Sequence, residues 1–265
     1  MKKTLFALLS LLLVLSLTAC GVPAAEPTQS PASSAPVATE TPTTEPTEEP
    51  MPEPTPELVV VFTDEVLEEK AREAMNKPTG DITLAEAEAV TELDLSIEPA
   101  TSLPRIKDIS SLKYFTNLTT LKLAWALDSN DGAVDISALA GLTKLIALYM
   151  NSNGIEDISA LAGMTNMRDL KIWGNNITDI SALSGMIMME DLWMQGNQIT
   201  DISALSGMTT GLYRLYLDGN QITDVTPLAG LTKLTSLKLA GNPIEDFSPL
   251  ADIYPNLEEK DFELK

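Results

Sequence analysis

The sequence predicts an α/β solenoid whose short parallel strands line a concave face and whose tight turns form the opposite side. Three observations predict this fold. A pattern of apolar residues recurs every 22 residues in the second half of the chain. Apolar and polar residues alternate at the start of each repeat, as in a strand with one buried side. A proline-rich segment separates the repeats from the N-terminus. Such short repeats cannot bury their apolar side chains alone, so we expect stacking to create one elongated core.

The first 19 residues predict a secretory signal peptide. Lys2 and Lys3 precede an apolar run over residues 5–17, which is shorter than the ~20 residues of a membrane-spanning helix. The sequence LTACG around Cys20 resembles the lipobox of bacterial lipoproteins. The resemblance implies an acyl (palmitate-type) anchor at Cys20 and a location on the extracellular face of the membrane of a Gram-positive-type bacterium. The alternative is an ordinary signal peptide, which would leave Cys20 as an unpaired thiol in an exported chain.

Residues 20–57 are predicted to be a disordered tether. Ten of the 17 prolines lie between residues 21 and 57, together with seven glutamates and no basic residue. A segment with so few apolar residues cannot form a packed core, so we expect it to be extended. As polyproline helix it would span at most ~115 Å.

Residues 58–89 predict a small helical cap ahead of the repeats. A short strand is expected over residues 59–62. Thr63 is the expected N-cap of a first helix, with two acidic residues in its first turn, and this helix is expected to end near Asn76. A second helix is expected to begin at Thr83, which opens a Ser/Thr-x-x-Glu capping box.

Residues 90–265 contain about seven repeats, of which the first two carry insertions. The five regular units begin at Leu145, Met167, Met189, Leu212 and Leu234. Their common core, L-x-x-L-x-L-x-x-N-x-I with some methionine substitutions, is the leucine-rich-repeat signature. The methionines in core positions are expected to act as adaptable apolar filler.

One asparagine and one aspartate recur in every regular unit. The asparagines mark the point where the chain leaves the strand, and their side chains are expected to satisfy backbone groups there as a ladder. The aspartates precede the turn and are expected to cap free amides. The two sets are Asn153, Asn175, Asn197, Asn220 and Asn242, and Asp157, Asp179, Asp201, Asp224 and Asp246. Because residues that recur in every repeat are usually structural, we expect neither a metal ion nor a cofactor. Residues 128–132 resemble a calcium loop only loosely.

The repeat frame predicts which side chains point outward from the strands. Aromatic residues make up only 5% of the chain, yet four of them fall on outward positions of the middle units, beside charged residues. This composition is typical of binding hot spots. The predicted ligand-binding residues are Tyr149, Asp169, Lys171, Trp173, Asp191, Trp193, Arg214, Tyr216 and Asp218. The frame also places Thr120, Lys122, Ala124, Ala147, Asn151, Gln195, Ser236, Lys238 and Ala240 outward. The alternative is that these aromatics merely suit strands or cover one another. Trp125 lies beside an insertion in the repeat, and we interpret its side chain as part of the packing of the cap.

Composition excludes several classes of function. A net charge of −21 argues against nucleic acid as a partner. The chain has no histidine, which is the commonest general base, and it has neither a Gly-x-Ser-x-Gly motif nor a phosphate-binding loop. We therefore expect a binding module without catalytic residues. Its partner is predicted to be a protein or peptide. A glycan or cell-wall ligand is the alternative, because aromatic platforms also stack on sugars.

The Asp-Ile-Ser-x-Leu segments, the period and the helical preface together resemble the internalin-like leucine-rich-repeat proteins of Gram-positive bacteria. The preface includes Phe62-Thr63-Asp64 and the segment over residues 80–83. The resemblance implies a curved solenoid with 3₁₀ turns on its convex side, a helical N-terminal cap, and recognition of proteins through the concave face. The chain is expected to be a monomer. It has few repeats and no wall-sorting motif, which argues against a role in host invasion.

Overall fold

The computed structural model describes residues 57–130 and 132–264. They belong to one compact unit, Pro54–Lys265. The predicted signal peptide, Cys20 and nearly all of the predicted tether lie outside the described residues. Within the described ranges, no helix combines the length and the apolar character needed to cross a membrane.

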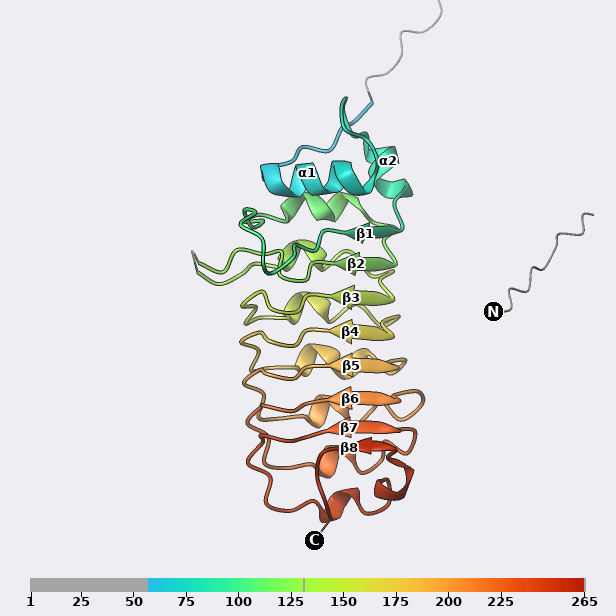
Figure 1. The fold of residues 1–265 in the computed structure, drawn as a ribbon. Coiled ribbons are helices and arrows are strands. Elements are labelled where there is room, and N and C mark those ends of the chain that lie inside the picture. The colour runs from blue at the N-terminus through green and yellow to red at the C-terminus, as the bar shows by residue number, and fades with distance from the viewer. Residues whose placement is uncertain (1–56, 131, 265) are drawn as a thin grey trace, which may run out of the picture. The chain divides into compact units, whose positions relative to one another are not determined.

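Eight short parallel strands form one sheet in sequence order, which confirms the predicted solenoid (Figure 1). The strands are β1 (Glu92–Asp94), β2 (Thr120–Lys122), β3 (Ala147–Tyr149), β4 (Asp169–Lys171), β5 (Asp191–Trp193), β6 (Arg214–Tyr216), β7 (Ser236–Lys238) and β8 (Glu259–Lys260). The central leucines of β1 to β7 lie opposite one another, as Leu148, Leu170 and Leu192 illustrate. Equivalent positions of successive repeats therefore form continuous rows. The repeat pattern predicted seven units, so β8 is an addition that it did not predict.

Short 3₁₀ helices form the side opposite the strands, as the family resemblance implied. They are η1 (Ser110–Tyr114), η2 (Ser137–Leu139), η3 (Ser159–Leu161), η4 (Ser181–Gly185), η5 (Ser203–Leu205), η6 (Thr226–Leu228), η7 (Ser248–Leu250) and η8 (Tyr254–Asn256). The recurring aspartate precedes each of η1 to η7. Its carboxylate accepts a hydrogen bond from the first amide of the helix, as between Asp157 Oδ1 and Ser159 N at 2.7 Å. This bond holds the pKa of Asp157 below its ordinary value. The expected capping role is confirmed.

The core is a continuous column of apolar side chains between the strands and the 3₁₀ helices. Each regular unit contributes its leucines, isoleucines and methionines, which are nearly all fully buried. The methionines in core positions are Met150, Met164, Met167, Met186, Met189, Met194 and Met208. Because each unit buries apolar surface of its neighbour, the interfaces between adjacent units contribute much of the free energy that stabilises the fold.

The recurring asparagines form the predicted ladder. Asn197 Nδ2 donates to Met194 O of its own unit at 2.9 Å and to Ile172 O of the preceding unit at 3.1 Å. Its Oδ1 accepts from Ile177 N at 3.1 Å. The side chain thus satisfies three backbone groups at a point where the chain turns and cannot pair with a strand. The equivalent residues repeat this arrangement along the solenoid.

Two helices, α1 (Glu65–Ala74) and α2 (Leu84–Ala89), lie at the β1 end of the sheet (Figure 1). The prediction for Thr63 was wrong, because the N-cap of α1 is Asp64, which accepts from Leu67 N at 2.9 Å. Asp64 Oδ2 also accepts from Lys107 N at 2.8 Å, a bond that joins the cap to the first repeat. The strand expected over residues 59–62 is reduced to a single antiparallel bridge, between Val59 and Thr83. The capping box at the start of α2 is confirmed.

The C-terminal end of the core is closed by residues outside the repeat pattern. Phe262 is buried and stacks on Phe247, with ring centroids 4.9 Å apart. Asp261 Oδ1 accepts from Leu239 N at 2.7 Å and from Ala240 N at 3.1 Å. Its carboxylate thus takes the place of the strand carbonyl that another full repeat would provide. These contacts hold β8 against β7.

Candidate ligand-binding face

The outward side chains of the strands form three rows along the sheet, and we call this surface the strand face. The first row contains Asp169, Asp191 and Arg214, and continues to Ser236 and Glu259. The central row contains Lys122, Tyr149, Lys171, Trp193, Tyr216 and Lys238. The third row contains Asn151, Trp173, Gln195 and Asp218. The pairing registers of β2 to β8 place the members of the first and central rows side by side.

The central row alternates cations with aromatic rings except at Trp193 and Tyr216, which are direct neighbours. Lys171 Nζ lies 4.6 Å from the ring centroid of Tyr149 and 4.6 Å from that of Trp193. Trp193 in turn contacts Tyr216, with ring centroids 5.0 Å apart and an angle of 40° between the ring planes. Lys238 Nζ lies 4.7 Å from the ring centroid of Tyr216. We call this run of five side chains, from Tyr149 to Lys238, the cation–aromatic ladder.

Carboxylates of the first row hold the polar ends of the three ladder aromatics. Tyr149 Oη donates to Asp169, and Trp193 Nε1 donates to Asp191. Tyr216 Oη donates to Glu259 at 2.9 Å. Partial burial and then the hydrogen bond to Asp169 raise the pKa of Tyr149, because a phenolate would face a carboxylate. Each ring therefore has a defined orientation before any ligand is present.

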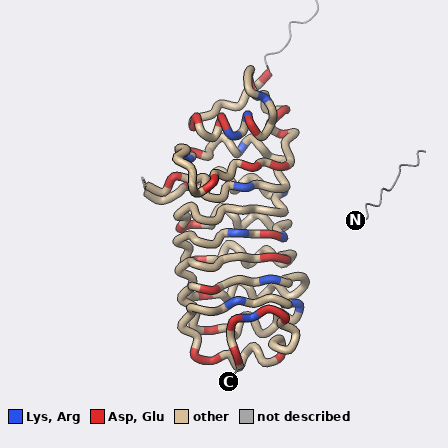
Figure 2. Tube along the Cα trace, viewed as in Figure 1, with Lys and Arg blue, Asp and Glu red and all other residues tan. Residues whose placement is uncertain are grey.

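The cations of the strand face are also paired with carboxylates, and Figure 2 marks where the acidic and basic residues lie along the chain. Lys122 lies 3.2 Å from Asp94, Lys171 lies 3.6 Å from Asp169, and Lys238 lies 2.7 Å from Glu259. These are distances between Nζ and a carboxylate oxygen. The hydrogen bond from Lys238, followed by those from Ser236 and Tyr216, lowers the pKa of Glu259 to about 2.

Asp191 is the one predicted site residue that the structure buries, with 5% of its surface exposed. Arg214 on the neighbouring strand covers it, and Arg214 Nε donates to Asp191 Oδ2 at 3.0 Å. Trp193 holds its other oxygen. A ligand would meet the exposed guanidinium of Arg214 rather than the Asp191 carboxylate.

The third row adds an aromatic pair that the sequence did not predict. Trp125 packs edge-on against Trp173, with ring centroids 5.2 Å apart. Its backbone has a φ of 52°, a left-handed turn that follows β2 and directs the chain into the insertion. The interpretation of Trp125 as cap packing is wrong, because this contact joins it to the strand face. The insertion interrupts the repeat frame here, so no sequence signal identified the pair.

Asp218 and Gln195 complete the third row. Burial raises the pKa of Asp218, and the nearby carboxylate of Asp261 raises it further. Gln195 Oε1 is buried and has no hydrogen-bond donor within the part of the chain that the structure describes. These two acceptors occupy adjacent strands, because Gly196 N donates to Asp218 O at 2.9 Å.

The structure thus brings all nine predicted site residues to one face and adds three neighbours. Trp125 packs on Trp173, Lys238 extends the ladder, and Glu259 holds Tyr216. Glu259 belongs to β8, whose sequence lacks the repeat pattern. Lys238 was predicted to point outward but was not among the predicted ligand-binding residues; its contact with the Tyr216 ring and its ion pair with Glu259 join it to the site.

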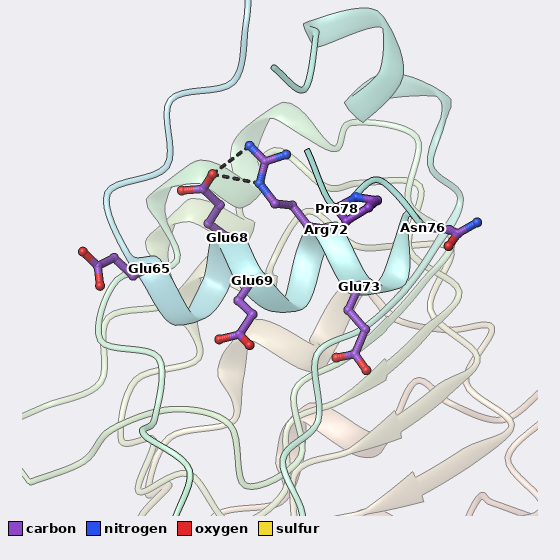
Figure 3. A pocket seen from close by; sticks show the side chains of 7 residues that line it. All are labelled: Glu65, Glu68, Glu69, Arg72, Glu73, Asn76 and Pro78. Carbon is purple, nitrogen blue, oxygen red and sulfur yellow. Dashed lines mark hydrogen bonds and ion pairs between the residues drawn. The ribbon is translucent and has the colours of Figure 1, made fainter. Parts of the chain in front are cut away.

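Two of the depressions on the described surface lie at the helical cap and at the edge of the strand face. One lies on α1 and is lined mainly by Glu65, Glu68, Glu69 and Glu73, with Arg72 bound to Glu68 (Figure 3). It contains no aromatic side chain. The other lies at the edge of the first row, beside the ion pair of Arg168 with Glu190. Among the described residues, no three acidic side chains gather closely enough to hold a metal ion.

Comparison with known proteins identifies the repeats independently. The family model of Leucine Rich repeats (2 copies) matches residues 143–185, 187–230 and 210–252. No curated protein sequence matches the chain. The crystal structure of internalin C2 from Listeria monocytogenes is similar at 30% identity and a TM-score of 0.62, covering 77% of this chain and 95% of that one. A second internalin of the same organism, inlF, is similar at 30% identity and a TM-score of 0.61, covering 78% of this chain and 65% of that one.

Proposed function

The chain belongs to the internalin-like leucine-rich-repeat proteins, and on this premise we propose that it is a membrane-anchored extracellular protein whose strand face binds a protein or peptide ligand. The cation–aromatic ladder carries the proposal. It places Tyr149, Trp193 and Tyr216 in one row, each with a fixed polar end. Aromatic side chains and arginine supply most of the binding energy at protein interfaces. Because the side chains of the ladder are already ordered, little of their conformational entropy would be lost when a ligand binds.

The orientation of the rings favours a protein over a glycan. Sugars stack on free ring faces, but the Trp193 ring has Lys171 on one neighbouring strand and Tyr216 on the other. Lysines likewise lie over the rings of Tyr149 and Tyr216. A ligand would therefore meet mainly ring edges and the alkyl stems of lysines, a mixed surface that suits peptide side chains.

The anchor at Cys20 is a separate part of the proposal. Cys20 is the only cysteine of the chain and lies at the end of the predicted signal. Two acyl chains suffice for stable attachment to a membrane, whereas one is marginal. Wild type and Cys20→Ser would be expressed in a Gram-positive host with an alkyne analogue of palmitate. We expect label and membrane association in the wild type alone. Label in neither protein would reject the anchor without affecting the binding proposal.

The test of binding uses Pro54–Lys265, the compact unit that contains the whole described core. It would be screened against a displayed library of surface-protein fragments and against a glycan array. The test variant is the pair Trp193→Ala and Tyr216→Ala. The control is Tyr213→Ala, because Tyr213 is exposed and lies outside the ladder. Circular dichroism would establish that each variant folds.

We expect the wild type and Tyr213→Ala to select the same protein fragments, and the ladder variant to lose them by a factor of about 30 or more, as for the removal of a hot spot. Selection of glycans alone would identify the other ligand class. Fragments that bind the ladder variant as tightly as the wild type would reject the strand face as the site.

A further inference from the structure

The charges of the strand face are balanced except in the third row. Lys122, Lys171, Arg214 and Lys238 each have a carboxylate partner on their own or a neighbouring strand. Asp218 differs, because no ion pair forms to it within residues 57–130 and 132–264. Its nearest charged neighbours include both the cation of Lys238 and the carboxylate of Asp261. These pairs neutralise the four cations, so the additional carboxylate of Asp218 gives the face an excess of negative charge.

Asp218 lies in the third row of the strand face, next to Tyr216 of the ladder. It follows Tyr216 by two residues and thus points to the same side of the sheet. On the β5 side its neighbour is Gln195, whose buried Oε1 accepts no hydrogen bond from any residue that the structure describes. On the β7 side its neighbour is Ala240, because Gly219 N donates to Ala240 O at 2.8 Å. Ala240 is exposed and has only a methyl group, so it leaves space next to the Asp218 carboxylate.

The ladder also loses its alternation at this point. Lys171 separates Tyr149 from Trp193, but no cation separates Trp193 from Tyr216. A cation that approached Asp218 would lie next to Tyr216, which precedes Asp218 by two residues on the same side of the sheet. It would also relieve the repulsion between Asp218 and Asp261. A carboxylate that forms no ion pair among the described residues and a second acceptor, Gln195 Oε1, thus lie on adjacent strands beside the ladder.

We propose that the ligand inserts an arginine or lysine side chain beside Asp218, Trp193 and Tyr216, and that the partner is therefore a protein with a basic segment. This inference rests on the proposed function, since it names the chemistry of the ligand at the same face. Arginine fits the position best. Its planar guanidinium can donate to Asp218 and, after rotation of the amide, to Gln195 on the adjacent strand. The net charge of −21 would speed the approach of such a partner at low ionic strength.

The test compares two peptides that differ only in charge. One peptide carries arginines on a glycine–serine scaffold, and the other has citrulline, a neutral analogue of arginine, at the same positions. Each would be titrated into ¹⁵N-labelled Pro54–Lys265 while the amide signals of Asp218 and Gly219 and the indole signal of Trp193 are followed by nuclear magnetic resonance. The test variant is Asp218→Asn. The matched control is Asp252→Asn, because Asp252 is exposed and lies outside the strand face.

We expect the arginine peptide to shift these three signals and to bind about ten-fold more tightly than the citrulline peptide, as a charge-assisted hydrogen bond to a half-buried carboxylate should. Asp218→Asn should remove this preference, and Asp252→Asn should keep it. Equal binding of the two peptides, unchanged binding to Asp218→Asn, or shifts confined to other regions would each overturn the inference.

The library screen separates this outcome from failure of the proposed function. If the selected fragments require the ladder but bind Asp218→Asn as tightly as the wild type, only the inference of a basic ligand is overturned. If no protein fragment binds to the strand face, both proposals are overturned.

Discussion

Lys171 lies between the rings of Tyr149 and Trp193, with its Nζ 4.6 Å from each ring centroid. The register of the sheet brings the three together, because Lys171 is paired with Tyr149 in one direction and with Trp193 in the other. The cation fills the space between the rings, and Asp169 holds both Lys171 and the Tyr149 hydroxyl. The centre of the strand face is therefore ordered by its own contacts.

Replacement of Lys171 by methionine tests the energy of this contact. The variant keeps an apolar stem and removes the charge, so we expect the free energy of unfolding to fall by about 0.5–1 kcal/mol. Urea denaturation followed by circular dichroism measures the change. The control is Lys233→Met, because Lys233 is exposed on a turn away from the sheet. Equal stability of the two variants would show that the cation contributes nothing to the ladder.

Replacement of Asn197 by alanine tests the asparagine ladder. The variant leaves Ile172 O, Met194 O and Ile177 N without their partner in a buried position. Unsatisfied buried backbone groups cost about 1–3 kcal/mol each, and we expect a loss of roughly 3 kcal/mol or more. Asn242→Ala should cost less, because Asn242 is only half-buried in the last unit. Denaturation curves that rank the two variants in the reverse order would contradict this account.

The Glu259 carboxylate predicts how stability depends on pH at the C-terminal end. Its pKa in the folded chain is lowered to about 2 from an ordinary value of 4.5. Its contribution is therefore fully present above pH 4.5 and is lost as the pH falls toward 2. We expect Glu259→Gln to lower the melting temperature at pH 7 and to match the wild type near pH 2.

The neighbouring residue supplies a control for this experiment. Glu258 is exposed, and its side chain has no ion pair or hydrogen bond among the residues described. Glu258→Gln should therefore have the same melting temperature as the wild type at both pH values. A deficit of Glu259→Gln that persists at pH 2 would show that packing rather than charge is responsible.

Replacement of Phe262 by alanine tests the closure of the core. The variant removes the ring that stacks on Phe247 and contacts Tyr254 at a centroid distance of 6.0 Å. In a repeat protein each unit contacts mainly its neighbours, so the loss should remain local. We expect faster hydrogen exchange in β7 and β8 and little change in β3 to β5. Uniform acceleration along the chain would mean that the solenoid unfolds as a single cooperative unit.

Much of the strand face could be predicted because the repeats have nearly equal length. When units stack in register, a position within the repeat becomes a row on the sheet. The 22-residue period therefore placed Tyr149, Lys171 and Trp193 side by side without knowledge of the structure. The same reasoning predicted the asparagine ladder and the aspartate caps, because each satisfies backbone groups that every unit leaves unpaired.

The features that the sequence did not determine depend on contacts between segments that the period does not relate. Asp64 rather than Thr63 caps α1, since only Asp64 can also accept the amide of Lys107 from the first repeat. Either residue type caps a helix well, so local sequence left the choice open. Trp125 reaches Trp173 through a left-handed turn at the start of an insertion.

The sequence by itself determined the solenoid, its rows and the set of outward side chains. The reason is that stacking the units in register buries the apolar side chains of every repeat at once. Only the tertiary structure decided which of those side chains remain available. Arg214 covers Asp191, Glu259 lies on an unpredicted strand and accepts from Tyr216, and Asp218 forms no ion pair with any cation among the described residues. These outcomes depend on side-chain torsions and on distances between neighbouring strands, which a one-dimensional pattern does not contain.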